Sequence, residues 1–144
     1  MQTALNILAT TKGLELSGEI APDVPATLIG DELRLQQILL NLASNAIKFT
    51  EHGSVRARIF LPDATHWALQ VADTGIGIPI EAQQHIFDAF WQIDSTATRL
   101  HRGSGLGLAI VKQLAELMSG RISLASRPGE GSTFTIVFPL EKVA

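Results

Sequence analysis

Five polar side chains between positions 34 and 48 are spaced so that a helix would align them on one stripe. The spacings are 3, 4, 4 and 3 residues, and the set is Arg34, Gln37, Asn41, Asn45 and Lys48. At about 3.6 residues per turn these positions cover roughly 80° of the helix surface. Almost every other residue from Leu33 to Phe49 is apolar, which predicts a mostly buried helix with a narrow amide and cationic seam. Buried amides need hydrogen-bond partners, and a polar ligand with anionic groups would supply them. The alternative is that the seam is only the exposed edge of a core helix.

Two glycine clusters follow this stretch. The first is Asp73-Thr74-Gly75-Ile76-Gly77, and the second is Gly103-Ser104-Gly105-Leu106-Gly107. Neither cluster has the Gly-Lys-Ser/Thr ending of a P-loop or the third glycine of a dinucleotide fingerprint. The second would expose backbone N–H groups at a helix N-terminus, a place that favours phosphate, although a flexible hinge would use the same residues.

Asp73 differs in kind from the glycines beside it. It is a carboxylate at the end of an apolar strand pattern and just before a glycine turn. Such a carboxylate can accept a hydrogen bond from an exocyclic amine, and the alternative is an Asx turn that caps the loop.

The elements that must position these groups can be read from hydrophobic periodicity. Alternating patterns predict about five strands, at 14–20, 54–61, 66–73, 120–127 and 132–140, and helical patterns predict four helices, at 2–11, 31–53, 81–90 and 104–118. Short turns join two of the strand pairs, so the sequence predicts an α+β fold, a two-layer sandwich whose mixed, largely antiparallel sheet has helices on one face. Residues 91–103 have little periodicity and read as a long functional loop.

Composition limits the function classes. The chain has 144 residues, 46% of them hydrophobic and 17% charged, with a net charge of −3 and no cysteine. This suits one domain over 1–144 and argues against a nucleic-acid partner, a disulfide framework or a thiolate metal site. No apolar run reaches the roughly 20 residues that span a bilayer, so we expect no membrane contact by this domain.

Five motifs stand in order along the chain: NLASNAIKF at 41–49, DTGIGI at 73–78, IFDAF at 86–90, RGSGLGLAI at 102–110 and GEGSTF at 129–134. Together they resemble the N box, the two glycine boxes, the phenylalanine box and the final turn of the catalytic ATP-binding domain of sensor histidine kinases. That domain belongs to the ATPase superfamily that also contains DNA gyrase, MutL and the ninety-kilodalton heat-shock chaperones. The resemblance implies the Bergerat ATP-binding fold.

The resemblance assigns roles to the polar stripe. Asn45 matches the asparagine that ligates Mg²⁺, Lys48 the phosphate-binding lysine, and Phe49 the aromatic position near the nucleotide. Asn41 stands where gyrase-like hydrolases carry a glutamate general base, and an amide cannot take a proton from water near neutral pH. The resemblance therefore implies transfer to an acceptor side chain rather than hydrolysis. It assigns no role to Arg34 or Gln37.

The same resemblance assigns the adenine contacts. Asp73 matches the aspartate that accepts from the N6 amine, and Gly75 and Gly77 match positions where the backbone approaches the base. Ser132 aligns with a hydroxyl that supports the adenine site through water.

The second glycine box and the preceding loop match the family's triphosphate-binding segment. Gly103, Gly105, Leu106 and Gly107 would wrap the triphosphate. Residues 91–103 would form the ATP lid, in which Arg99, Arg102 or His101 could meet the γ-phosphate. Gln92 stands where some family members place an arginine.

The implied function is to bind ATP·Mg²⁺ and donate the γ-phosphate to a histidine on a separate dimerisation domain, and through it to a response regulator. None of His52, His66, His85 and His101 has the residues that follow a phosphoacceptor, so we expect a fragment of a longer kinase. Its expected location is the cytoplasm, either in a soluble kinase or as part of a membrane-anchored sensor. The alternatives are a hydrolysing gyrase- or chaperone-type ATPase and a degenerate, non-catalytic docking module.

Overall fold

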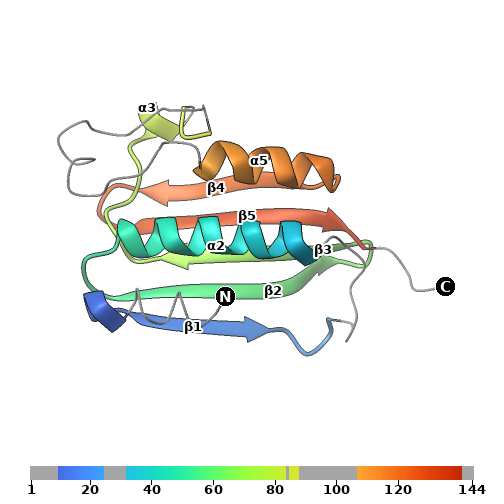
Figure 1. The fold of residues 1–144 in the computed structure, drawn as a ribbon, viewed down its shortest axis with the longest axis horizontal. Coiled ribbons are helices and arrows are strands. Elements are labelled where there is room, and N and C mark those ends of the chain that lie inside the picture. Colours follow the sequence, from blue (N-terminus) through green and yellow to red (C-terminus); the bar gives the residue numbers. More distant parts are fainter. Residues whose placement is uncertain (1–9, 25–31, 84, 88–106, 141–144) are drawn as a thin grey trace.

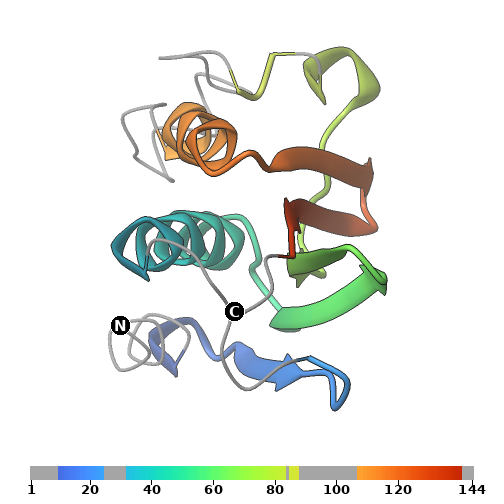
Figure 2. The ribbon, with the colours of Figure 1, turned by 90° about the vertical axis from the view of Figure 1, so that its right-hand side faces the viewer.

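The computed structural model describes residues 10–24, 32–83, 85–87 and 107–140, and these form one sheet with two long helices against one of its faces (Figures 1 and 2). The elements are β1 (Glu15–Ile20), α2 (Glu32–Lys48), β2 (Ser54–Asp63), β3 (His66–Asp73), α3 (Ile80–Gln83), α5 (Gly107–Leu117), β4 (Arg121–Arg127) and β5 (Gly131–Pro139).

The sheet has five strands in the order β1-β2-β3-β5-β4. The β1–β2 pair is parallel, because the chain returns from β1 to β2 through α2, and the other three pairs are antiparallel. The predicted α+β class and the mixed, largely antiparallel sheet with helices on one face are confirmed.

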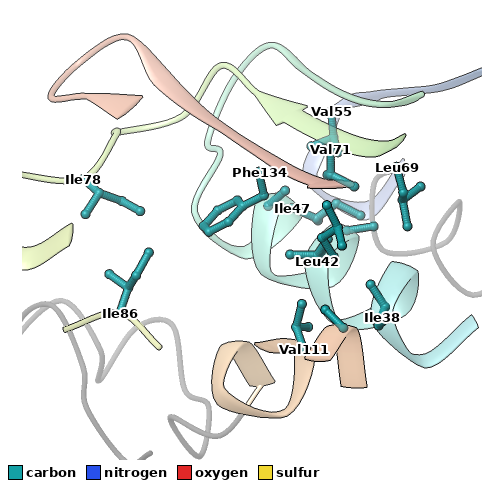
Figure 3. Packing of buried hydrophobic residues seen from close by; sticks show 14 of the residues in the cluster. Ile38, Leu42, Ile47, Val55, Leu69, Val71, Ile78, Ile86, Val111 and Phe134 are labelled. Carbon is teal, nitrogen blue, oxygen red and sulfur yellow. The ribbon is translucent and has the colours of Figure 1, made fainter. Parts of the chain in front are cut away.

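The core lies between the sheet and the two long helices. Along β5, Phe134, Ile136 and Phe138 are buried, while the residues between them point to the other face and are partly exposed. Leu42 of α2 and Val111 of α5 pack into the same hydrophobic cluster (Figure 3). This packing fixes α2 against the sheet, and α2 carries the polar stripe.

The structure corrects two details of the predicted helices. The stripe helix is less buried than its composition suggests: Leu33 is 77% exposed and Leu40 is 38% exposed, because these side chains lie on the face of α2 that points away from the sheet. The helix predicted at 81–90 is also too long. Within the described residues it is α3, four residues long, and residues 85–87 form a turn in which Ile86 is buried.

The first predicted helix is described only at its end, where residues 10–12 are helical. None of the helices that the structure describes combines the length and the hydropathy that a membrane crossing requires.

Candidate functional site

The C-terminal end of α2 is held by a series of hydrogen bonds. A helix leaves its last carbonyl groups without intrahelical partners, so each must find another donor. Here Asn45 O accepts from Phe49 N (3.2 Å), Ala46 O from the Thr50 hydroxyl (2.7 Å), and Phe49 O from Ile76 N (3.4 Å). The end of the helix is thereby joined to the loop that follows β3.

Lys12 supplies two further bonds to the same helix end. Its Nζ donates to Ile47 O at 2.9 Å and to Lys48 O at 3.0 Å, and it lies 3.7 Å from a carboxylate oxygen of Glu51. A cation at a helix C-terminus also interacts favourably with the helix dipole. The chain before β1 is thus fastened to the end of α2.

The stripe residues lie where a helix places them. Asn41, Asn45 and Lys48 all belong to α2, are half-buried and follow one another at a spacing of one turn. Phe49 directly follows the helix and is also half-buried, whereas Gln37 at the other end of the stripe is exposed. The structure therefore brings together the four site residues predicted on this stretch.

Asp73 ends β3 beside the end of α2. Its Oδ1 accepts a hydrogen bond from Gly75 N at 2.9 Å, the Asx turn that the sequence offered as an alternative. Burial raises the pKa of the Asp73 carboxyl above its usual range, and the backbone N–H groups of Gly75 and Ser132 and the Thr50 hydroxyl act in the opposite direction. Asp73 is thus a partly buried carboxylate whose charged form is supported by hydrogen bonds rather than by a cation.

Gly75 and Gly77 permit a close approach of three chain segments. A Cβ atom at Gly75 would clash with Phe49 O, and one at Gly77, where φ is +73°, would clash with Arg127 O. The loop after β3 is therefore pressed against the end of α2 on one side and against the β4–β5 turn on the other. These two glycines do lie beside Asp73, as predicted.

Ser132 lies opposite Asp73 in the β3–β5 pairing and is buried. Its hydroxyl is 2.9 Å from the hydroxyl of Ser126, which in turn accepts from Ile78 N at 2.8 Å. Ser132 is thus connected to the glycine loop through Ser126.

The remaining predicted residues belong mostly to the second glycine box. Arg99, Arg102, Gly103, Gly105 and Leu106, with the predicted lid at 91–103, lie outside the described residues. Gly107 is the first residue of α5, which packs beside α2. The backbone of Gly107 therefore lies at a helix N-terminus, as the sequence predicted.

Three residues of this region were missed by the sequence reasoning. Lys12 and Thr50 fasten the end of α2, and Ser126 joins Ser132 to the glycine loop. Thr50 directly follows the NLASNAIKF motif, so its position was a usable signal. Lys12 and Ser126 act through contacts that the sequence pattern does not encode.

A family model described as histidine kinase-, DNA gyrase B- and HSP90-like ATPase matches residues 30–142. The signal transduction histidine-protein kinase BarA of Escherichia coli K12 is 50% identical over 127 residues, which cover 85% of this chain and 14% of BarA.

Two solved structures are also similar to the chain over nearly its whole length. Full-length ShkA in complex with AMPPNP superimposes with a TM-score of 0.87 and 38% identity, over 99% of this chain and 29% of that one. The mycobacterial sensor histidine kinase MprB gives a TM-score of 0.77 and 30% identity, over 99% of this chain and 94% of that one. The predicted resemblance is confirmed. The chain belongs to the family of histidine kinase-, DNA gyrase B- and HSP90-like ATPases, and its relatives within that family are sensor histidine kinases.

Proposed function

We propose that the chain binds ATP with Mg²⁺ and donates the γ-phosphate to a histidine on a separate dimerisation domain. The observation that carries the proposal is Asp73, a partly buried carboxylate whose Oδ1 is held by Gly75 N beside the fastened end of α2. The ShkA relative was solved in complex with the ATP analogue AMPPNP, which supports nucleotide binding by this chain.

Asp73 is suited to select adenine. One carboxylate oxygen accepts from Gly75 N, and a carboxylate has further acceptor capacity for an exocyclic amine. Guanine presents a carbonyl at its six-position, which has no hydrogen to donate, so the same carboxylate disfavours it. Gly75 keeps a side chain out of the space beside this carboxylate, and Gly77 allows the loop to approach the β4–β5 turn. We infer that the base lies against this loop.

The phosphates would lie along the stripe of α2 toward α5. Lys48 supplies a cation at the end of the helix, and the N-terminus of α5 at Gly107 supplies backbone N–H groups. Arg99, Arg102, Gly103, Gly105 and Leu106 are proposed to complete the triphosphate site from the lid and the second glycine box.

Asn45 is proposed as the protein ligand of Mg²⁺. An amide oxygen is a hard ligand of the kind that Mg²⁺ accepts, and this ion usually takes few protein ligands and completes its shell with phosphates and water. The described residues contain no cluster of three His, Cys, Asp or Glu side chains that could hold a metal, which agrees with a site built mainly by the nucleotide. When bound, Mg²⁺ would neutralise negative charge on the phosphates during transfer.

Asn41 distinguishes transfer from hydrolysis. It is half-buried one turn before Asn45, where a hydrolase of this superfamily would place a glutamate base. An amide does not accept a proton from water at neutral pH, so the attacking group must be nucleophilic without the help of a base at position 41. A neutral imidazole on a partner domain is such a nucleophile. Through that domain, we propose that the phosphate reaches a response regulator.

The matched residues span 14% of the length of BarA, so the chain corresponds to a small part of that relative. We propose that residues 1–144 are a single catalytic domain of such a kinase and that they act on its cytoplasmic side.

Binding is tested by calorimetric titration of the chain with ATP, GTP, and ATP in the presence of EDTA. We expect binding of ATP that is stronger with Mg²⁺, much weaker binding of GTP, and loss of ATP binding in Asp73→Asn. The exposed Asp23→Asn is the matched control and should bind as the unmodified chain does. Equal affinity for ATP and GTP, or unchanged binding by Asp73→Asn, would contradict the proposal.

Transfer is tested with γ-labelled ATP and a separately purified helical-hairpin domain that carries the phosphoacceptor histidine. We expect acid-labile label on the hairpin domain and little release of inorganic phosphate by the chain alone. Rapid phosphate release without the acceptor would instead favour the hydrolysing ATPase. The absence of any binding at millimolar ATP would favour the docking module.

A further inference from the structure

The row of side chains at the glycine-loop end of the sheet is polar on the face that the helices cover. Asp73, Ser132 and Ser126 pair in register on β3, β5 and β4, which are neighbours in the sheet (Figure 1). Residues two positions apart in a strand share a face, and the next row on this face contains the buried Val71 and Phe134. Ser132 therefore lies between Ser126 and the carboxylate that is proposed to contact adenine.

The Ser126 hydroxyl has three hydrogen-bond contacts. Its Oγ accepts from Ile78 N at 2.8 Å, donates to Gly131 O at 2.9 Å and lies 2.9 Å from the Ser132 hydroxyl oxygen. A serine hydroxyl has one proton to donate and two lone pairs that can accept. Because the Ser126 proton goes to Gly131 O, the contact with Ser132 requires that Ser132 donates. This arrangement satisfies all three contacts and assigns the Ser132 proton to Ser126.

The direction of the Ser132 hydroxyl matters because Asp73 is its other neighbour in the row. Ser132 is 6% exposed, and among the described residues its hydroxyl has one hydrogen-bond partner, Ser126. A hydroxyl that can reach a carboxylate forms a strong, charge-assisted hydrogen bond with it. Such a bond would occupy acceptor capacity of Asp73 that the exocyclic amine of adenine needs. By accepting the Ser132 proton, Ser126 removes this competition.

Gln83 holds Ser126 and Ile78 together through their backbones. Its Nε2 donates to Ile78 O at 2.9 Å and to Ser126 O at 3.1 Å, one bond for each of its two protons. With the bond from Ile78 N to Ser126 Oγ, the three residues close a ring of hydrogen bonds between the glycine loop, α3 and β4. The position of the Ser126 hydroxyl is therefore fixed from three segments of the chain.

We propose that Ser126 is a positioning residue for the adenine contact: it accepts the proton of the Ser132 hydroxyl and so keeps that hydroxyl from donating to Asp73. The inference rests on the proposed function, because it assumes that Asp73 receives the exocyclic amine. It adds a residue of β4 that acts through Ser132. With its proton bound to Ser126, Ser132 offers only lone pairs to a water molecule of the adenine site.

The test is a double-mutant cycle of Ser126→Ala and Ser132→Ala, in which calorimetry measures ATP affinity and the melting temperature confirms folding. We expect Ser126→Ala to weaken ATP binding about five- to tenfold, because the Ser132 hydroxyl is then free to donate to Asp73. In the Ser132→Ala background the same substitution should change ATP affinity by less than about twofold, because the competing hydroxyl is gone. Ser126→Thr keeps a hydroxyl and should bind ATP within about twofold of the unmodified chain.

Two further variants serve as controls. Ser123→Ala removes an exposed hydroxyl from the other face of β4 and should leave ATP affinity unchanged. Gln83→Met removes the two bonds to Ile78 O and Ser126 O but leaves the Ser126 hydroxyl in place. We expect Gln83→Met to lower the melting temperature and to keep ATP affinity. It separates a weaker attachment of the glycine loop from the loss of the hydroxyl.

Three results would overturn the inference. The first is an ATP affinity of Ser126→Ala equal to that of the unmodified chain. The second is an equal loss from Ser126→Ala in the presence and absence of the Ser132 hydroxyl. The third is a Gln83→Met variant that loses as much ATP affinity as Ser126→Ala, since attachment of the loop would then explain both. If Ser126→Ala does not fold, Ser126→Cys, whose thiol is a weak donor and acceptor, takes its place in the cycle.

Asp73→Asn separates this inference from the proposed function. Loss of ATP binding in Asp73→Asn together with normal binding by Ser126→Ala would reject the role of Ser126 alone. Normal binding by Asp73→Asn would reject the proposed function itself.

Discussion

The ammonium group of Lys12 donates to the backbone carbonyl of Lys48 at 3.0 Å, although the two residues are 36 positions apart in the sequence. Lys12 thus holds the end of the helix from which Lys48 is proposed to reach phosphate. The bond also joins the segment before β1 to the proposed nucleotide site.

Replacing Lys12 should therefore weaken both the helix end and nucleotide binding. Lys12→Met keeps the aliphatic stem and removes the two hydrogen bonds to Ile47 O and Lys48 O. We expect a loss of about 1–2 kcal/mol in the free energy of unfolding, measured by urea denaturation, together with weaker ATP binding. Lys112→Met on the exposed face of α5 is the control and should change neither quantity. An unfolding free energy of Lys12→Met equal to that of Lys112→Met would contradict this account.

Gly77 and Gly13 offer a matched pair for the close approach at the glycine loop. Both have φ of +73°, so an alanine at either position meets the same backbone strain, about 1–2 kcal/mol. A Cβ at Gly13 has no atom within 4 Å, whereas one at Gly77 would clash with Arg127 O. Gly77→Ala should therefore lower the free energy of unfolding clearly more than Gly13→Ala. Equal losses in the two variants would mean that the loop can move away from the β4–β5 turn without penalty.

Much of the site could be predicted because its residues are neighbours in local patterns. Asn41, Asn45 and Lys48 follow helical spacing, and Asp73 ends a strand and precedes glycines, so their placement depends on one element each. Lys12 and Ser126 could not be found in this way. Lys12 bonds to Ile47, 35 residues away, and Ser126 accepts from Ile78, 48 residues away. These long-range contacts form only when distant segments of the chain have packed together.

The errors in the helices have a similar cause. Leu33 and Leu40 are apolar but exposed, because only one face of α2 meets the sheet and α5. Composition alone does not say which apolar side chains reach that face. The helix predicted at 81–90 is replaced at 85–87 by a turn with Ile86 buried, a tertiary contact that outweighs local helix preference.

Asn45 gives a direct test of the proposed Mg²⁺ ligand. Asn45→Ala should weaken ATP binding at least about tenfold when Mg²⁺ is present and leave the affinity in EDTA unchanged, because the amide acts through the ion. Gln37→Ala, an exposed position on the same stripe two turns earlier, is the control and should keep the full response to Mg²⁺. Calorimetry with and without EDTA measures both. Retention of the Mg²⁺ response in Asn45→Ala would assign the ion to other ligands.

The charged carboxylate of Asp73, which is proposed to bind adenine, should lower the free energy of unfolding at neutral pH. Burial raises its folded-state pKa above the unfolded value of 3.8, so the folded chain holds this proton more tightly than the unfolded chain. The contribution of Asp73 to stability is then most favourable at low pH, and it falls as the pH rises from about 4 through the folded-state pKa. Without nucleotide, Asp73→Asn should therefore melt at a higher temperature than the unmodified chain at pH 7.5, and the difference should shrink toward pH 4.

Asp63 provides the contrast of opposite sign. Hydrogen bonds from His66 and Thr65 lower the pKa of the Asp63 carboxyl to about 2, so its contribution to stability is present above pH 4 and is lost as the pH falls toward 2. Asp63→Asn should melt at a lower temperature than the unmodified chain at pH 7.5. Thermal melts of both variants at pH 7.5 and pH 4 thus separate a carboxylate retained for structure from one retained for its ligand. A lower melting temperature for Asp73→Asn at pH 7.5 would show that the Asp73 charge is structural and would remove the argument that it is kept for adenine.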